Sequence, residues 1–249
     1  YILTKIYGFP APRNAADLAT AEETAKYVID NADKIFTAEN KPASLGDEQW
    51  TPMITQQRPI ITNLALRANA WVWVERKDDV RQEVELPKYL RADPDQPQFS
   101  YFLFLAKFNQ RQKDINKVPG ALFHLARTAA YAGPNAAQIT AANRAAYLKT
   151  LTEIYTQYHG SEEGLPALLA LAKDNVLPPA NFNIKSITQI EQEKFADQQA
   201  YDLAHPQQTF IRDAIRTPLT GPDSDTLFES NYKDALLPLE FLGRFKATI

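Results

Sequence analysis

Apolar side chains recur at helical spacing in several segments that prolines and glycines separate. Between Thr20 and Phe36 they return every three or four residues, and Thr20-Ala-Glu-Glu23 has the sequence of a capping box. We therefore predict a helix over residues 20–36. Further helices are predicted at 119–131, 139–158, 166–174 and 187–203, with prolines in two of the first turns and glycines after two of the last turns.

The intervening segments give weaker patterns. Residues 42–59 are predicted to be irregular, with Trp50 and Met53 as anchors. Residues 60–76 fit a helix, although Trp71-Val72-Trp73-Val74 fits a strand equally well, and the pattern leaves both open. Residues 86–97 hold three prolines and alternating charges, which is typical of a linker or surface loop. The aromatic-rich segment 99–112 follows directly.

Both ends of the chain lack helical periodicity. Residues 1–13 combine apolar side chains with Pro10 and Pro12, and the last forty residues alternate prolines with short apolar pieces. We therefore expect a mainly α fold, a helical bundle core with extended N- and C-terminal arms. The expected division is an N-terminal arm with one helix at 1–50, a helical core domain at 51–205 and a C-terminal segment at 206–249.

Composition removes much catalytic chemistry. The 249 residues include 17 prolines, 8 glycines and no cysteine, which excludes disulfides, cysteine-ligated metals and cysteine nucleophiles. Of the three histidines, His124 fits a core or partner-facing position better than a catalytic base, His159 follows a helix end, and His205 precedes a proline. No nucleotide-binding, hydrolase or metalloprotease motif occurs. We predict no catalytic residue, no metal and no cofactor.

Positive charge gathers in the middle of a chain whose net charge is −3. Between residues 107 and 127 there are five Lys or Arg side chains against one acidic side chain. Aromatics followed by cations from Phe99 to Lys113 suit single-stranded nucleic acid, which needs stacking and phosphate neutralisation. The alternative is that the aromatics are buried in the core and the cations coat the next helical turn.

No membrane role is expected from the sequence. No apolar run reaches the roughly 18–20 residues that cross a bilayer, and the first residues do not resemble a signal peptide. The chain begins without Met, so residues preceding Tyr1 are possible.

An ordered series of short motifs lies between Leu125 and Pro218. In order, it comprises Leu125-Ala126-Arg127, Tyr131-Ala132-Gly133, Leu165-Pro166-Ala167-Leu168-Leu169, Pro178-Pro179-Ala180-Asn181-Phe182, Lys194-Phe195-Ala196, Pro206, and Ile211 through Ile215-Arg216-Thr217-Pro218. This series resembles the coat proteins of flexible filamentous plant viruses, particularly the potexvirus-like group. The resemblance implies a coat protein that polymerises helically around single-stranded RNA and is found in the virion and the host cytoplasm.

The resemblance also indicates where RNA would bind. That family lines its RNA pocket with a serine, an arginine and an aspartate, whose positions here hold Pro134-Asn135, the stretch from Tyr155 to His159, and Gln199. Together with the central cations, the candidate RNA-binding residues are Lys107, Arg111, Arg127, Asn135, Arg144, Lys149, His159, Asp202 and Arg212.

A helical polymer also needs contacts between copies that do not close into a ring. The candidate subunit-interface residues lie in the N-terminal arm and are Ile2, Leu3, Ile6, Tyr7 and Phe9; packing of this arm on its own subunit fits the sequence equally well. Two other functions stay open, a non-viral α-helical protein-interaction module and a soluble enzyme with a carboxylate-based site.

Overall fold

The computed structural model describes residues 14–206, 208–209 and 212, and it divides the chain into two compact units, 1–186 and 187–249. The described residues are mainly helical and contain no strand, which confirms the predicted mainly α class. The predicted interface residues from Ile2 to Phe9 lie outside the described residues, as does nearly all of the predicted C-terminal segment.

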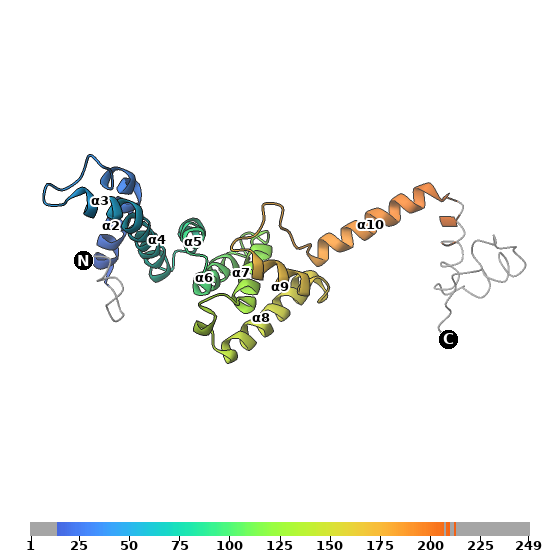
Figure 1. The fold of residues 1–249 in the computed structure, drawn as a ribbon. Helices are drawn as coiled ribbons and strands as arrows, with labels where there is room; N and C mark the ends of the chain where they lie inside the picture. The colour runs from blue at the N-terminus through green and yellow to red at the C-terminus, as the bar shows by residue number, and fades with distance from the viewer. Residues whose placement is uncertain (1–13, 207, 210–211, 213–249) are drawn as a thin grey trace, which may run out of the picture. The chain divides into compact units, whose positions relative to one another are not determined.

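Helices follow one another along the described chain, with the longest connections between α2 and α3 and between α9 and α10 (Figure 1). In chain order they are α2 (Ala15–Ile35), α3 (Asp47–Pro52), the π-helical turn η1 (Met53–Gln57), α4 (Arg58–Glu75), α5 (Asp79–Ala92), α6 (Pro97–Asn109), α7 (Lys117–Ala130), the 3-10 turn η2 (Ala136–Gln138), α8 (Ala141–His159), α9 (Leu165–Asp174) and α10 (Ile187–Ala204).

Helix α2 begins earlier than the capping box predicted. Asn14 is its N-cap, with a side-chain oxygen that accepts a hydrogen bond of 2.8 Å from the backbone N–H of Asp17. Thr20 lies inside the helix, where its hydroxyl donates to the carbonyl of Ala16 at 3.0 Å. Because the helix starts earlier, Leu18 joins the predicted apolar face of α2 and is buried with it against α4. The buried face of α2 is therefore one turn longer than predicted.

The segment predicted to be irregular is largely helical, because α3, η1 and α4 follow one another without a break from Asp47. Trp50 anchors it as predicted. Its side chain is buried, stacks on Phe36 with ring centroids 6.3 Å apart, and donates from Nε1 to the carbonyl of Thr37 at 2.8 Å. Met53 is half-buried at the start of η1.

Helix α4 settles the ambiguity at residues 71–74 in favour of a helix. It packs against α2 on one side and α5 on the other. Val72 belongs to the cluster with α2, whereas Ala70, Trp71 and Val74 belong to the cluster with α5 and α6. A helix buried on two sides is apolar nearly all round, and this explains why its sequence shows no clear period.

Residues 86–97 do not form the predicted linker, because α5 runs through Pro87 to Ala92. An interior proline costs a helix about 3 kcal/mol. Leu86, Tyr89 and Leu90 are completely buried, and each fully buried side chain of this size contributes roughly 1.5–3 kcal/mol. Burial against α4 and α6 therefore outweighs the proline.

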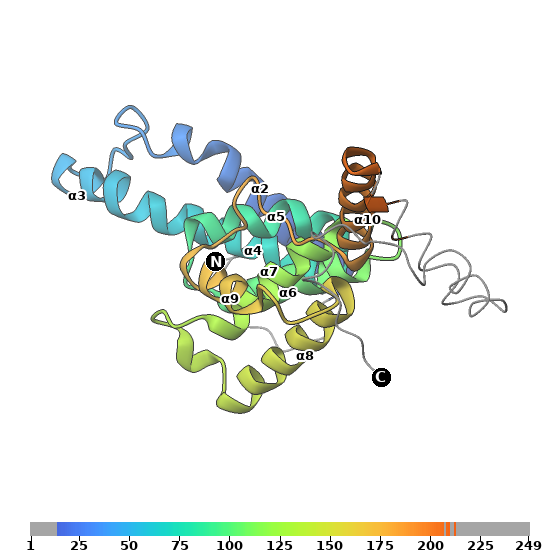
Figure 2. The same cartoon turned by 90° about the vertical axis from the view of Figure 1, so that its right-hand side faces the viewer.

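Helix α7 is central to the first unit and packs against α6, α8 and α9 (Figure 2). Every residue from Ala121 to Ala129 is buried. Helix α8 presents Leu151 and Tyr155 to this core and ends at Gly160, whose φ of 91° is the left-handed conformation that glycine adopts without strain. The predicted helices at 139–158 and 166–174 are confirmed within a few residues.

Helix α10 belongs to the second unit. It matches the predicted helix at 187–203, but the unit boundary at residue 187 differs from the predicted boundaries at 50 and 205. Helix α2 packs on α4 across the first of these predicted boundaries. The division into three domains stays a prediction.

Candidate nucleic-acid interface

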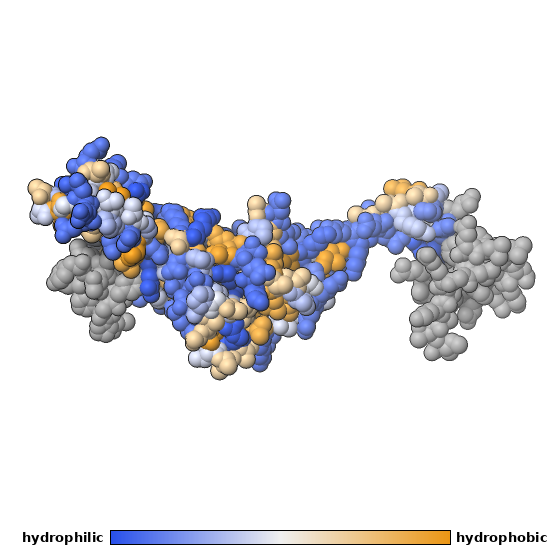
Figure 3. Space-filling view, viewed as in Figure 1, coloured by the Kyte–Doolittle hydropathy of each residue, from blue (hydrophilic) through white to orange (hydrophobic). Residues whose placement is uncertain are grey.

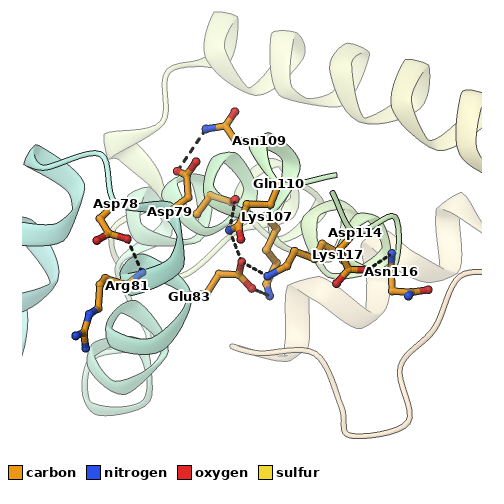
Figure 4. Close-up of polar contacts among 11 residues, drawn as sticks. Asp78, Asp79, Arg81, Glu83, Lys107, Asn109, Gln110, Asp114, Asn116 and Lys117 are labelled. Atoms are coloured by element: carbon orange, nitrogen blue, oxygen red, sulfur yellow. Dashed lines mark hydrogen bonds and ion pairs between the residues drawn. The ribbon is translucent and has the colours of Figure 1, made fainter. Parts of the chain in front are cut away.

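Glu83 on α5 forms ion pairs with two of the central cations, Lys107 and Lys117 (Figure 4). Its carboxylate accepts from Nζ of Lys107 at 2.8 Å and from Nζ of Lys117 at 2.6 Å, and the amide of Gln110 also donates to it. Burial raises the pKa of the Glu83 carboxyl, but the hydrogen bonds and charges of the two lysines outweigh it and hold the pKa below its usual value. The lysine side chains are 22% and 27% exposed, so their charge is largely satisfied within the chain.

The aromatic segment before these cations divides between core and surface. Phe99, Leu103 and Phe104 are buried, which confirms the core alternative for this part of α6. Arg111 is half-buried, donates from Nη1 to the carbonyl of Phe108 at 2.8 Å, and lies with its guanidinium carbon 3.8 Å from the Phe108 ring centroid. Its guanidinium is thereby held against an aromatic face.

Arg127 does not lie in a surface groove, because it is only 3% exposed. Its guanidinium donates to the carbonyl of Pro94 at 2.6 Å and to the carbonyl of Asn175 at 2.9 Å, joining the α5–α6 loop to the segment after α9. Burial lowers the pKa of Arg127, and the charges of Tyr131 and Asp95 oppose this effect. Its role in this structure is to link three segments, and a phosphate cannot reach it.

Asn135 also makes a structural contact. Its Nδ2 donates to the carbonyl of Asp95 at 2.5 Å, while the hydroxyl of Tyr131 donates to the carboxylate of the same Asp95 at 2.8 Å. Gly133 permits this arrangement, because a Cβ there would lie 2.6 Å from Cζ of Tyr131. The glycine turn therefore orders the loop after α7.

The other candidates in the first unit differ in how they are held. Arg144 is half-buried and donates to the carbonyl of Ala129 in the last turn of α7. His159 lies with Nδ1 2.8 Å from the carbonyl of Lys185, so Nδ1 carries the proton in this contact. Lys149 has a 79% exposed side chain and lies 4.0 Å from Glu153. Of these three, only Lys149 presents its charge to solvent.

Asp202 and Arg212 in the second unit form an ion pair. The two guanidinium nitrogens lie 2.7 Å and 3.0 Å from the two carboxylate oxygens of Asp202. Hydrogen bonding from Arg212 is the main cause that lowers the pKa of Asp202 to about 2. The structure therefore brings these two candidate RNA-binding residues, Asp202 and Arg212, into direct contact with each other.

His124 is buried in α7, as expected for a core position, and its Nδ1 has no hydrogen-bond partner. Desolvation, followed by the charges of Lys107 and Arg127, lowers its pKa to about 3. The imidazole is therefore neutral at physiological pH, which fits a structural role.

A cavity of about 330 Å³ opens between α6, α7, η2 and α8, and we call it the α6–α8 cavity. Its lining includes three aromatic and three amide side chains: Tyr101, Phe102, Tyr147, Gln98, Gln138 and Asn143. The rings of Tyr101 and Tyr147 lie 4.8 Å apart between centroids. No carboxylate lines this cavity.

None of the predicted RNA-binding residues lines the α6–α8 cavity. The sequence places Tyr147 on the apolar face of its helix and Tyr101 in the aromatic segment. Nothing in the sequence indicates that the packing of the helices brings these two tyrosines next to the three amide side chains. Glutamine and asparagine have no spacing that marks a site, so only the structure identifies these residues.

The described residues hold neither a membrane-spanning helix nor a metal-binding cluster. None of the described helices combines the length and hydropathy that a bilayer span requires. No group of three or more His, Asp or Glu residues in the described part of the chain is arranged to hold a metal ion.

Comparisons of this chain with models of protein families, with curated proteins and with solved structures found no match.

Proposed function

We propose that this chain is a coat protein that polymerises helically around single-stranded RNA to form a flexible filament, with virion and host cytoplasm as its locations. The ordered motif series from Leu125 to Pro218 supports the proposal from the sequence. The motifs as far as Lys194-Phe195-Ala196 fall in α7 and the turn after it, at the start of α9, in the segment that follows α9, and in α10. Pro206 follows α10, and the last motif, from Ile211 to Pro218, lies outside the described residues except for Arg212.

The exposure of α10 is the structural observation that carries the proposal. None of its residues is buried, and it exposes four large apolar side chains, Ile187, Phe195, Tyr201 and Leu203, with Phe195 65% and Leu203 83% exposed. Figure 3 shows hydrophobic residues among the hydrophilic ones along this helix. Apolar side chains at this exposure favour contact with another chain, and in a homopolymer that chain is a second copy.

The charge distribution suits RNA packaging that depends on assembly. Internal partners hold Lys107, Lys117 and Arg127, whereas Lys149 stays exposed. A single subunit therefore offers few of its predicted RNA-binding cations to phosphate. Many subunits along one RNA add their contributions, and backbone contacts of this kind are indifferent to sequence.

A protein-interaction module is the second candidate function. The exposed apolar side chains of α10 would suit a different protein as well as another copy of this chain. The third candidate, an enzyme with a carboxylate-based site, needs two desolvated carboxylates in a concave pocket, and the α6–α8 cavity does not provide them.

Substitutions on α10 separate self-assembly from the alternatives. Sedimentation of the full chain, with and without single-stranded RNA, is compared for the double variant Phe195→Ser, Leu203→Ser and for the control Gln192→Ser, Ala200→Ser. Both change two exposed residues of α10 to serine, and helix propensity falls at least as much in the control, because alanine is the strongest helix former. We expect the first variant to lose large assemblies and the control to retain them. Equal assembly of both variants would contradict the role of α10.

The N-terminal arm gives an independent test. Removal of residues 1–13 is expected to shorten the polymer while circular dichroism and the thermal midpoint of the helical unit stay unchanged. A wild-type chain that stays monomeric in the presence of RNA but binds another protein through α10 would favour the interaction module.

A further inference from the structure

We propose that the α6–α8 cavity binds one unstacked base of a single-stranded RNA. The choice of RNA as the ligand rests on the proposed function. The cavity itself is an observation of the structure, and its lining has the two kinds of groups that recognise a base, aromatic rings for the base face and amides for the base edge.

The aromatic wall comes from two helices. Tyr101 on α6 and Tyr147 on α8 are half-buried, their centroids are 4.8 Å apart, and their planes are inclined by 36°. Desolvation raises the pKa of Tyr147, so its ring stays an uncharged phenol over the physiological range. An uncharged ring held by a neighbouring ring is a rigid platform on which any base can stack.

Three amide side chains line the cavity next to the two tyrosine rings. Within the described part of the chain, the side chains of Gln98, Gln138 and Asn143 make no hydrogen bond, although all three line the cavity. The backbone N–H of Asn143 is satisfied by the hydroxyl of Thr140 at 3.1 Å, which fixes the start of α8. Each amide offers both a donor and an acceptor, so the three together suit the edges of different bases.

Charge and size favour a nucleotide over a peptide helix. The cavity has no carboxylate in its lining, and Gln98 and Asn143 lie in the first turns of α6 and α8, whose dipoles present their positive ends there. A phosphate at the rim is therefore not repelled. The volume of about 330 Å³ is near the lower limit of small-molecule pockets, roughly 300–1,000 Å³, which suits a single flat group.

A matched pair of tyrosine variants tests the proposal. Tyr147 and Tyr158 both lie on α8, both are half-buried and pack against the same core, but only Tyr147 lines the cavity. The full-length variants Tyr147→Leu and Tyr158→Leu are compared with the wild type for binding of a short single-stranded RNA that carries the fluorescent base 2-aminopurine. Gln138→Leu, at an exposed position, is a third variant that leaves the core untouched.

We expect quenching of 2-aminopurine by the wild type and by Tyr158→Leu, because stacking quenches this base. Tyr147→Leu should lose the quenching and bind roughly 5- to 150-fold more weakly, as expected for loss of one base stack, and Gln138→Leu should also bind more weakly.

Equal binding and quenching by all variants would overturn the inference and leave the proposed function standing. Loss of RNA-free assembly in Tyr147→Leu, with RNA binding unchanged, would assign the cavity to a segment of a second copy and also overturn it. A wild-type chain that neither binds RNA nor assembles would overturn the proposed function.

Discussion

Nζ of Lys107 lies 2.8 Å from the Glu83 carboxylate, although 24 positions separate the two residues in the sequence. Lys117 binds the other oxygen of the same carboxylate at 2.6 Å. The arrangement joins α5, α6 and α7 through one acidic side chain. The most basic segment of the chain therefore stabilises the fold of the first unit.

Removal of the carboxylate should destabilise the first unit. Glu83→Gln leaves Lys107 and Lys117 without an anionic partner while the site stays largely buried. Hydrogen bonds to charged groups contribute about 1.5–3 kcal/mol, so we expect a loss of this order in the free energy of unfolding. Urea denaturation measures it, with Glu162→Gln as the control, because the exposed Glu162 makes no side-chain interaction in the described structure. Equal stability of the two variants would contradict the assigned role.

The contribution of Glu83 should depend on pH. Because the folded state lowers the pKa of this carboxyl below its ordinary value of 4.5, the unfolded chain takes up the proton first as the pH falls. The stabilisation is therefore complete well above pH 4.5 and is lost as the pH falls through the lower folded pKa. The difference in unfolding free energy between the wild type and Glu83→Gln should shrink below pH 4.5. A difference that stays constant down to about pH 3 would contradict this account.

His124 should make the fold sensitive to mild acid. The unfolded chain protonates this histidine near pH 6.5, whereas the buried imidazole resists protonation down to about pH 3. Between these values stability falls as the pH is lowered, by about 1.4 kcal/mol per pH unit for one group. We expect the wild type to lose about 2 kcal/mol more than His124→Leu between about pH 6.5 and pH 5, as measured by denaturant unfolding. Parallel pH profiles would show that His124 is accessible to protons.

Arg127 and Lys149 should differ in their effects on stability and RNA binding. Arg127→Met leaves the carbonyls of Pro94 and Asn175 without their donor, and we expect a loss of roughly 2–4 kcal/mol in unfolding free energy. The slope of RNA affinity against salt should not change, because the guanidinium is buried. Lys149→Met should leave stability unchanged and flatten the salt slope by about one unit. A flatter slope for Arg127→Met would mean that its charge is exposed on binding.

Two glycine variants test the packing of the loop after α7. In Gly133→Ala the new Cβ would lie 2.6 Å from Cζ of Tyr131 and 2.9 Å from the Asp95 carboxylate. Overpacking of this kind costs about 1–3 kcal/mol, with loss of the Tyr131–Asp95 hydrogen bond in addition. In Gly120→Ala the nearest atom is Cδ of the flexible Lys107 at 3.2 Å, so we expect a change below about 1 kcal/mol. Thermal unfolding compares the two, and an equal loss would contradict the close packing at Gly133.

The helices predicted best are those with a periodic apolar face and a glycine or proline at one terminus. The segments that became α8 and α9 had one apolar face each, and Gly160 and Pro166 marked their ends. Helix α5 was missed because Pro87 and its charges outweighed the signal of Leu86 and Leu90. Its stability depends on burial against α4 and α6, and a local pattern cannot report contacts between helices.

The candidate site was less predictable for a related reason. Composition identified a basic segment, but it could not show that Glu83 lies opposite Lys107 or that Arg127 points at two backbone carbonyls. The α6–α8 cavity combines side chains from separate segments. Its existence depends on how α6, α7 and α8 pack together, which no local spacing encodes.

Electron microscopy of the purified full-length chain mixed with single-stranded RNA tests the central claim most directly. The coat-protein account predicts flexible filaments whose ultraviolet spectrum shows nucleic acid and whose RNA resists ribonuclease. Monodisperse globular particles with a protein-like spectrum and no bound RNA, in every buffer tried, would contradict it.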